Sequence, residues 1–330
     1  MQAVCLFAEP IHDDAAALLA AAGIEVRHAS TRDLAAVPDE LADVDAIIVR
    51  NALTAAAMDA APRLAVIGNH GTGTDAVDLA HASRLGIPVV STPTGNVAAV
   101  AEHAILLMLA VARRTLAADS ATRRRDTRFK YDRPMLSLHG RTLGVIGFGH
   151  TGRCVTALAQ GLGMRVVVWS PHASTSTIEE VGARRADTLD ELLDAADVVS
   201  LHRPLRADTR HTLDREALAR LKPTAIVVNT SRGGLIDEEA LADALAEGRL
   251  FGAGLDVLAE EPLAPSSRLA SLDNVVLSPH VAGSTQEALR ETARQCAAQV
   301  VDVLQDRRPA SLVDPDVWAR RRFIPPRTCP

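Results

Sequence analysis

Short apolar runs rich in valine and isoleucine alternate with alanine- and leucine-rich amphipathic segments along almost the whole chain. The runs are apolar without a break, which is typical of strands buried on both faces of a parallel sheet. A first group of predicted strands consists of "AVCLFA", "DAIIVR", "LAVIGN" and "IPVVST". A second group consists of "RTLGVIGFG", "RVVVW", "DVVSLH", "AIVVNT", "GAGLDV" and "NVVLSP". The alternation predicts an α/β fold with crossover helices.

Helical patterns fill the segments between these strands. Short ones are predicted at His12–Ala22 and Asp78–Leu85, and long ones at Asn96–Arg114 and Ser284–Gln305. The Arg-rich stretch Arg123–Arg133 is predicted to be a solvated surface segment. A chain of 330 residues with two groups of strands is expected to form two domains. Ligands of open parallel sheets bind at the carboxyl ends of the strands, so residues at those ends are the first candidates for a site.

Composition narrows the classes of protein that the chain can represent. Its net charge of −6 gives no electrostatic reason to expect a nucleic-acid or anionic-membrane partner. No apolar run reaches the roughly 18 residues of a membrane span, and the N-terminus lacks the pattern of a signal peptide. The four cysteines, Cys5, Cys154, Cys296 and Cys329, have no metal-binding spacing and suit a reduced protein. We therefore expect a cytoplasmic protein without a metal site.

The segment "GVIGFGHTGR" predicts a cradle for a dinucleotide. Gly147, Gly149 and Gly152 form a G-x-G-x-x-G pattern directly after a predicted strand and at the start of a helix. The first glycine permits the tight turn, the second lets the backbone approach a pyrophosphate, and the third lets helix and strand pack closely. The amides of His150 and Thr151 then face the anion. The structural alternative is an ordinary strand-to-helix turn.

The residue that usually selects the cofactor is replaced in this chain. Dinucleotide-binding folds place an acidic residue about 20 positions after the glycines, at the end of the next strand. Here that position holds Ser170. A hydroxyl cannot accept two hydrogen bonds from the ribose diol of NAD, as a carboxylate does. It also does not repel the 2′-phosphate of NADP. Because His172, Ser174 and Arg203 can offer donors to a phosphate, we expect both NAD and NADP to bind, with any preference toward NADP.

Several long motifs give the chain a strong resemblance to the D-2-hydroxyacid dehydrogenase family. They are "VIGNHGTGTDAVDL", "TPTGNVAAVAEHAILLMLA", "SLHRPLRADTRHTLD", "VVNTSRGGLIDEEAL", "GAGLDVLAEEPL" and "LSPHVAGST". The resemblance implies a Rossmann-type nucleotide-binding domain, residues 95–285, inserted into a smaller flavodoxin-like α/β substrate domain, residues 1–94 and 286–330. It also implies a homodimer, which the run Glu102–Ala112 supports because it is apolar on too many sides for a one-faced surface helix.

By this resemblance the catalytic residues are Arg232, Glu261 and His280. The planar, permanently charged fork of Arg232 would grip a substrate carboxylate and polarise the adjacent carbonyl. His280 would deliver or remove the proton of the 2-hydroxy group, and Glu261 would favour the imidazolium and hold the ring. Each has a plainer alternative as a surface ion pair or a loop histidine. Glu261 is chosen over Glu260 because the family's acid immediately precedes a proline.

The remaining site residues follow by the same matching. Asp256 would hold the nicotinamide carboxamide, and the cofactor side would include Arg203, Pro204, Thr209, Thr230, Ser231 and Gly283. The substrate side would include Arg50, Asn51, Gly71, Thr72, Gly73 and Asn96. For the glycines an ordinary tight turn is the alternative. His103, His202 and His211 match family positions too, and we interpret them as structural or peripheral.

The expected activity is reversible hydride transfer between NAD(P) and a small D-2-hydroxy acid or its 2-keto acid. Two other functions stay open at this point. One is oxidation of phosphite by a related enzyme, whereas Glu261 argues against formate, whose enzymes carry glutamine at that position. The other is a dinucleotide-sensing binding module such as the C-terminal binding protein co-repressors. We expect no amino-acid-binding regulatory domain after the fold, and the sequence does not identify the substrate.

Overall fold

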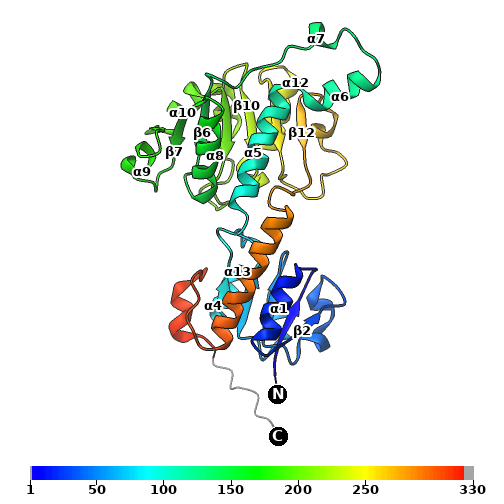
Figure 1. Cartoon of the computed structure of the whole chain (residues 1–330), viewed down its shortest axis with the longest axis vertical. Coiled ribbons are helices and arrows are strands. Elements are labelled where there is room, and N and C mark those ends of the chain that lie inside the picture. Colours follow the sequence, from blue (N-terminus) through cyan, green and yellow to red (C-terminus); the bar gives the residue numbers. More distant parts are fainter. Residues whose placement is uncertain (1, 323–330) are drawn as a thin grey trace. The chain divides into compact units, whose positions relative to one another are not determined.

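The computed structural model describes residues 2–322 and divides the chain into two compact units (Figure 1). Unit 1 comprises the described residues up to Asn96 and from Ser284 onward, and unit 2 comprises Val97–Gly283. Cys329, one of the cysteines considered above, lies outside the described residues. Each unit has its own parallel sheet and its own apolar core.

Unit 1 is built on a five-stranded sheet in the order β2-β1-β3-β4-β5. All four strand pairs are parallel, and the order is that of flavodoxin-like folds. The strands are β1 Ala3–Phe7, β2 Ile24–His28, β3 Ala46–Val49, β4 Val66–Asn69 and β5 Val89–Val90. The helices are α1 Asp13–Ala21, α2 Pro38–Leu41, α3 Ala55–Asp59, α4 Leu79–Arg84 and α13 Gln286–Leu304, with short 3₁₀ turns at Leu34–Ala36 and Pro315–Arg320.

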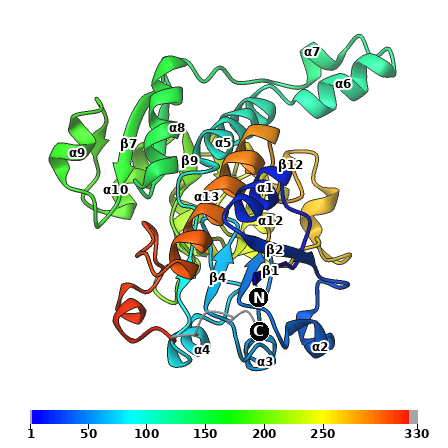
Figure 2. The same cartoon turned by 60° about the horizontal axis from the view of Figure 1, so that its bottom comes forward.

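Both faces of this sheet are covered. The helices α1 and α13 lie side by side on one face (Figures 1 and 2), and their apolar residues form one core cluster with the strands. A Cβ on Gly68 would lie 2.8 Å from Sγ of Cys296, so α13 packs directly on β4. A second cluster on the other face includes Leu41, Met58 and Ala82 from the shorter helices. Burial on two faces explains why the strands are continuously apolar.

Unit 2 is built on a seven-stranded parallel sheet in the order β12-β11-β10-β9-β6-β7-β8. Its strands are β6 Thr142–Ile146, β7 Arg165–Trp169, β8 Arg184–Arg185, β9 Val198–Leu201, β10 Ile226–Asn229, β11 Gly252–Leu255 and β12 Val275–Leu277. The chain first adds strands on one side of β6 and then returns to add β9 on the other side. This reversal creates a switch point at the carboxyl ends of β6 and β9, where doubly wound sheets bind their ligands.

The helices of unit 2 also cover both sheet faces. Helices α5 Val97–Ala112 and α8 His150–Gly161 pack side by side on one face (Figure 1). The core of the opposite face includes Leu192, Leu218 and Leu241, from α10 Leu189–Ala195, α11 Arg215–Arg220 and α12 Glu238–Ala246. The remaining elements are α6 Thr115–Arg123, α7 Phe129–Asp132, α9 Thr175–Glu179 and 3₁₀ turns at Gly233–Leu235 and Arg268–Ser271.

The predicted fold class is confirmed, because both sheets are parallel and lie between helices. The Arg-rich stretch Arg123–Arg133 is largely exposed, as predicted; it includes α7 and lies in a segment that projects from the body of unit 2 (Figures 1 and 2). Within residues 2–322, none of the helices is both long and apolar enough to cross a membrane.

Candidate active site

The glycine loop after β6 is shaped by close backbone contacts. Gly147 has a φ of 97°, and a Cβ there would lie 2.4 Å from the carbonyl oxygen of His202. A Cβ on Gly152 would lie 2.2 Å from the carbonyl oxygen of Gly147. Helix α8 then begins at His150 without a side-chain cap, so the amides of its first turn, including that of Thr151, remain for an anion. These features fit a dinucleotide pyrophosphate at this loop.

Backbone bonds join the ends of β6, β7 and β9. The amide of Gly147 donates to the carbonyl of Trp169 at 2.9 Å, and the amide of His202 donates to Ile146 at 2.7 Å. Ser170, the residue after Trp169, is partly buried and begins a turn. The loop after β9 contains Arg203 and Pro204, and the Thr209 hydroxyl donates to the carbonyl of Pro204 at 2.8 Å. Thr209 is buried, so its side chain stabilises the loop.

The end of β10 carries Thr230, Ser231 and Arg232 in a turn that Asn229 shapes. The Asn229 amide donates to the carbonyl of Arg232 at 2.8 Å and accepts from the backbone amide of Ser231 at 3.0 Å. The Ser231 hydroxyl donates to the carbonyl of Leu201 at 2.7 Å, which ties the turn to the neighbouring strand. The guanidinium of Arg232 donates to the carbonyl of Ser231 at 2.7 Å. The turn is therefore rigidly held.

The turn after Arg232 packs against the segment that follows β11. A Cβ on Gly233 would lie 1.9 Å from the carbonyl carbon of Leu258, a contact that only glycine permits. The amide of Ala259 donates to a carboxylate oxygen of Glu238. Burial raises the pKa of the Glu238 carboxyl, and nearby carboxylates including that of Glu261 act in the same direction. The Arg232 turn and the Glu261 turn are thus in direct contact.

Glu261 and His280 form a hydrogen-bonded pair. His280 Nδ1 lies 2.8 Å from Glu261 Oε2, and the other oxygen of Glu261 accepts the amide of Leu258 at 3.0 Å. Half of the His280 side-chain surface and 38% of the Glu261 side-chain surface remain exposed, so a ligand can reach both. A pocket of about 470 Å³ borders the pair, with apolar walls from Leu258, Leu263 and Leu277.

A buried network stabilises the turn that carries His280. Asp256, at 1% exposure, accepts from the amides of Val281 and Ala282 at 2.9 Å each and from the hydroxyl of Ser278 at 2.6 Å. Because the Ser278 proton goes to Asp256, His103 Nε2 donates to the Ser278 oxygen at 2.8 Å. This assigns a structural contact to His103. The next residue after Ala282, Gly283, is the last of unit 2.

The predicted substrate-side residues all lie in unit 1. Glu9 accepts the amides of Arg50 and Asn51 at 2.9 and 3.2 Å, which fixes the turn after β3. The loop Gly71–Gly73 is shaped by the Asn69 side chain, which donates to the carbonyls of Gly71 and Gly73 at 2.8 and 3.0 Å. Thr72 bonds to Asn96 at 3.3 Å. The structure therefore brings the loop and Asn96 together.

His70, which is buried, and His202, which is partly buried, stay neutral near pH 7. Burial, together with the nearby charge of Arg50, lowers the pKa of His70 to about 4. Burial alone lowers the pKa of His202 to about 4, and its Nε2 bonds to the hydroxyl of Ser200 at 2.8 Å. Neither ring suits proton transfer at neutral pH. His211 has a left-handed backbone and bonds through its amide to Gly234.

The sequence interpretation missed several residues that shape the site. They are Glu9, Asn69, Asn229, Glu238 and Ser278. For Asn69 and Asn229 there was a usable signal, because a polar residue ends an apolar strand run just before a candidate loop. For the others the partners lie too far along the chain to show in a local pattern. No group of three potential metal ligands occurs within residues 2–322.

Comparison with known proteins gives consistent matches. Residues 105–282 match the NAD binding domain of the D-isomer specific 2-hydroxyacid dehydrogenases. A D-3-phosphoglycerate dehydrogenase from Methanocaldococcus jannaschii is 38% identical over 91% of this chain and 57% of its own length. A glyoxylate reductase from Korarchaeum cryptofilum is 36% identical over 84% of this chain and 85% of its own length. This chain thus spans little more than half of the first phosphoglycerate dehydrogenases that it matches.

One similar solved structure contains a bound cofactor. An NADPH-dependent glyoxylate/hydroxypyruvate reductase from Sinorhizobium meliloti, in complex with NADP and malonate, superposes with a TM-score of 0.86. It is 29% identical and covers 98% of this chain and all of its own.

We expect Gly233→Ala to destabilise unit 2 by about 1–3 kcal/mol, because the new methyl group overlaps the Leu258 backbone. Gly234→Ala is a matched control, since its Cβ would meet the ends of two flexible side chains, Leu205 at 3.0 Å and Arg210 at 3.6 Å, and no backbone atom is among its nearest contacts. Urea unfolding of both variants measures the difference. Equal stability of the two would show that the contact with Leu258 is not tight.

We also expect the protein to lose stability as the pH falls from about 6.5 toward 4. Unfolded histidine binds a proton near pH 6.5, whereas folded His202 does so only near 4, so protons favour the unfolded state in that window. His202→Gln should lose less stability between pH 7.5 and 5 than the wild type, by urea unfolding at both values. An identical loss would contradict the buried neutral imidazole.

Proposed function

Because the chain belongs to the D-isomer specific 2-hydroxyacid dehydrogenase family, we propose that it interconverts a small D-2-hydroxy acid and its 2-keto acid by hydride transfer with NAD(H) or NADP(H). The observation that carries the proposal is the Glu261–His280 pair, whose atoms lie 2.8 Å apart beside an accessible pocket. A histidine held by a carboxylate is the acid–base group that this chemistry needs.

The glycine loop is the proposed site for the pyrophosphate, through the amides of His150, Thr151 and their neighbours. The adenosine side would contact Ser170, Arg203 and Pro204, in the loop that the buried Thr209 holds, and the nicotinamide side Thr230, Ser231, Asp256 and Gly283. Each Asp256 oxygen has capacity for two hydrogen bonds, so Oδ2, which accepts from Ala282, can also accept from a carboxamide. When bound, the nicotinamide would supply or accept the hydride of the reaction. Ser170 favours neither NAD nor NADP, so both would bind.

Arg232 is the proposed anchor for the substrate. Its guanidinium is permanently charged and can bond a carboxylate with two parallel N–H groups. The bonds of Asn229 hold the turn in place, so little ordering is needed when substrate binds. An arginine that binds the carboxylate also stabilises the negative charge that develops on the adjacent carbonyl oxygen during reduction.

His280 is the proposed proton donor for reduction and acceptor for oxidation. Its Nδ1 donates to Glu261, which leaves Nε2 as the atom that exchanges a proton with the substrate oxygen. Glu261 is held in turn by the amide of Leu258, so the ring orientation is fixed. In unit 1, Arg50, Asn51, the loop Gly71–Gly73 and Asn96 are proposed to contact the substrate as well.

The names of the relatives suggest which substrates to test first. Glyoxylate and hydroxypyruvate appear among the substrates named for the glyoxylate and hydroxypyruvate reductases. Purified protein should oxidise NADH or NADPH with at least one of these or with another 2-keto acid. Dinucleotide binding without turnover of any 2-keto acid would favour a binding module, and turnover of phosphite alone would favour the phosphite enzyme.

Arg232→Ala should lower kcat/KM by roughly 100-fold or more, because the substrate carboxylate loses its bidentate partner. Binding of the reduced cofactor, followed by its fluorescence, should change little. Arg249→Ala is a control, because Arg249 is exposed and pairs with Glu247 on the surface. A normal kcat/KM for the Arg232 variant with every active keto acid would reject the assignment.

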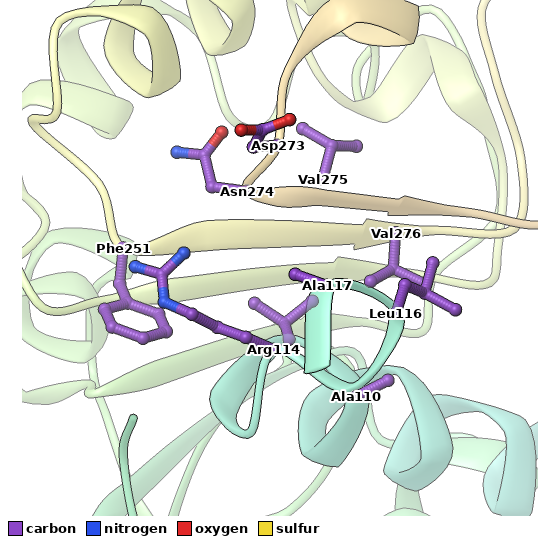
Figure 3. Close-up of a pocket in the computed structure, with 10 residues that line it drawn as sticks. Ala110, Arg114, Leu116, Ala117, Phe251, Asp273, Asn274, Val275 and Val276 are labelled. Atoms are coloured by element: carbon purple, nitrogen blue, oxygen red, sulfur yellow. The ribbon is translucent and has the colours of Figure 1, made fainter. Parts of the chain in front are cut away.

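We further propose that a second copy of the chain covers α5, α6 and α7. Among the described residues, five large exposed apolar side chains lie in this short region: Leu106, Leu109, Leu116, Tyr131 and Met135. A pocket beside α6 (Figure 3) holds only about 20 Å³, so it is too small for a substrate. There Arg114 lies 4.6 Å above the Phe251 ring, next to Leu116 and Ala117 (Figure 3). An apolar face of this kind suits a subunit contact.

Light scattering at micromolar concentration should give about twice the 34.9 kDa of one chain. Leu109→Arg should shift the mass toward the monomer, because a charge would be buried at the contact. Leu158→Arg is the matched control: Leu158 lies on α8 and is 38% exposed, against 36% for Leu109. A monomeric wild type would reject the proposal, and so would equal dissociation of both variants.

A further inference from the structure

Arg203 lies where the ends of three strands of unit 2 come together. It follows β9, and a Cβ on Gly147 of the loop after β6 would lie 3.1 Å from its Cβ. Its guanidinium carbon lies 5.1 Å from the ring centroid of Trp169, the last residue of β7. Ser170, at the position that selects the cofactor, is the next residue. One arginine is therefore placed against both the glycine loop and the ribose-side strand end.

The charge of Arg203 is not balanced by a close carboxylate. Within residues 2–322, Arg203 forms no ion pair, although Asp208 is near enough to act on its charge. Among the described residues, its one side-chain hydrogen bond goes to the Thr212 hydroxyl at 3.5 Å, which is long. Burial lowers the pKa of the Arg203 guanidinium, which nevertheless stays protonated. A partly buried cation without a close carboxylate favours binding of an anion beside it.

The position of the guanidinium over the Trp169 ring restricts where that anion can bind. A guanidinium that lies over an aromatic ring keeps its N–H groups in the guanidinium plane, free of the ring face. These groups can bond the oxygens of a phosphate in a bidentate manner. In doubly wound folds the ribose 2′ position lies near the end of the second strand, and an arginine nearby accommodates a 2′-phosphate. In this chain the residue directly after Ser170 is Pro171, so that strand does not supply the arginine.

We infer that Arg203, from the end of β9, binds the 2′-phosphate of NADP(H) and makes NADP(H) the preferred cofactor of this chain. The inference rests on the proposed dinucleotide site and assigns its specificity to one residue. Ser170 permits the phosphate because it brings no negative charge, and Arg203 attracts it. The plainer alternative is that Arg203 only packs on Trp169 and leaves both cofactors equal.

The test measures binding without turnover, so it does not depend on the identity of the substrate. Calorimetry of the full chain would compare adenosine 2′,5′-bisphosphate with 5′-AMP, which differ at the 2′ position. The wild type should bind the bisphosphate at least about tenfold more tightly. Arg203→Leu should remove most of that difference, because it lowers the affinity for the bisphosphate far more than the affinity for 5′-AMP. Fluorescence titration with NADPH and NADH should show the same pattern.

Matched variants separate a specific contact from general electrostatics. Arg206→Leu removes one exposed positive charge three residues away and should keep most of the preference. Ser170→Asp should reverse the preference, because a carboxylate bonds the ribose diol and repels the phosphate. If the leucine variant is unfolded by circular dichroism, Arg203→Lys replaces it, with a weaker but retained preference expected from a point charge.

The outcomes are distinguishable. Equal binding of the two nucleotides by the wild type, an unchanged preference in Arg203→Leu, or an equal loss in Arg206→Leu would each overturn the inference while leaving the dinucleotide site intact. For Arg203→Lys, an unchanged preference would also overturn it. Failure of the wild type to bind either nucleotide or either dinucleotide would overturn the proposed function itself.

Discussion

The buried carboxylate of Asp256 is the group on which the proposed chemistry of unit 2 depends. It accepts two backbone amides and one hydroxyl from the segment after β12, and so joins the ends of β11 and β12. His280 lies within this segment with a φ of 53°, a left-handed backbone that is unfavourable for a residue with a side chain. Such a conformation persists only where surrounding contacts over-determine it. The Asp256 carboxylate supplies those contacts. It thereby positions the imidazole of His280 next to Glu261.

The local sequence was enough to predict the fold class and the glycine loop, because both depend on short-range patterns. Buried parallel strands are continuous apolar runs, and a tight turn needs its glycines at fixed spacing. The pattern of apolar residues did not predict β8, because its residues Arg184 and Arg185 are charged. It also did not predict the helix α7. It also missed the polar residues that shape the site. Glu9, for example, holds the turn at Arg50 from 41 residues away. Such contacts exist only once the sheet has brought distant strand ends together.

The proposed parts of the site differ in how they are built. The acid–base pair and the arginine turn belong to three neighbouring strand ends of one sheet, joined by backbone hydrogen bonds and by a glycine contact. The proposed substrate contacts of unit 1 lie on loops held by single polar side chains, Glu9 and Asn69. Loops of this kind tolerate change better than packed strand ends. The relatives are named for different hydroxy and keto acids. This is compatible with an acid–base pair on strand ends in unit 2 and changeable substrate contacts on loops in unit 1.

The packing of α13 on the unit 1 sheet has a consequence for how the chain folds as it is made. One face of that sheet is covered by Ala293, Cys296 and Val300, yet its strands end by Val90. At a synthesis rate of roughly 5–20 residues per second, the ribosome needs about 10–40 s more to reach the end of α13. Unit 2 is contiguous and is fully synthesised at Gly283, before α13 has emerged. The strands of unit 1 are therefore made before unit 2 and covered after it, so one apolar face of the nascent sheet stays exposed throughout that interval.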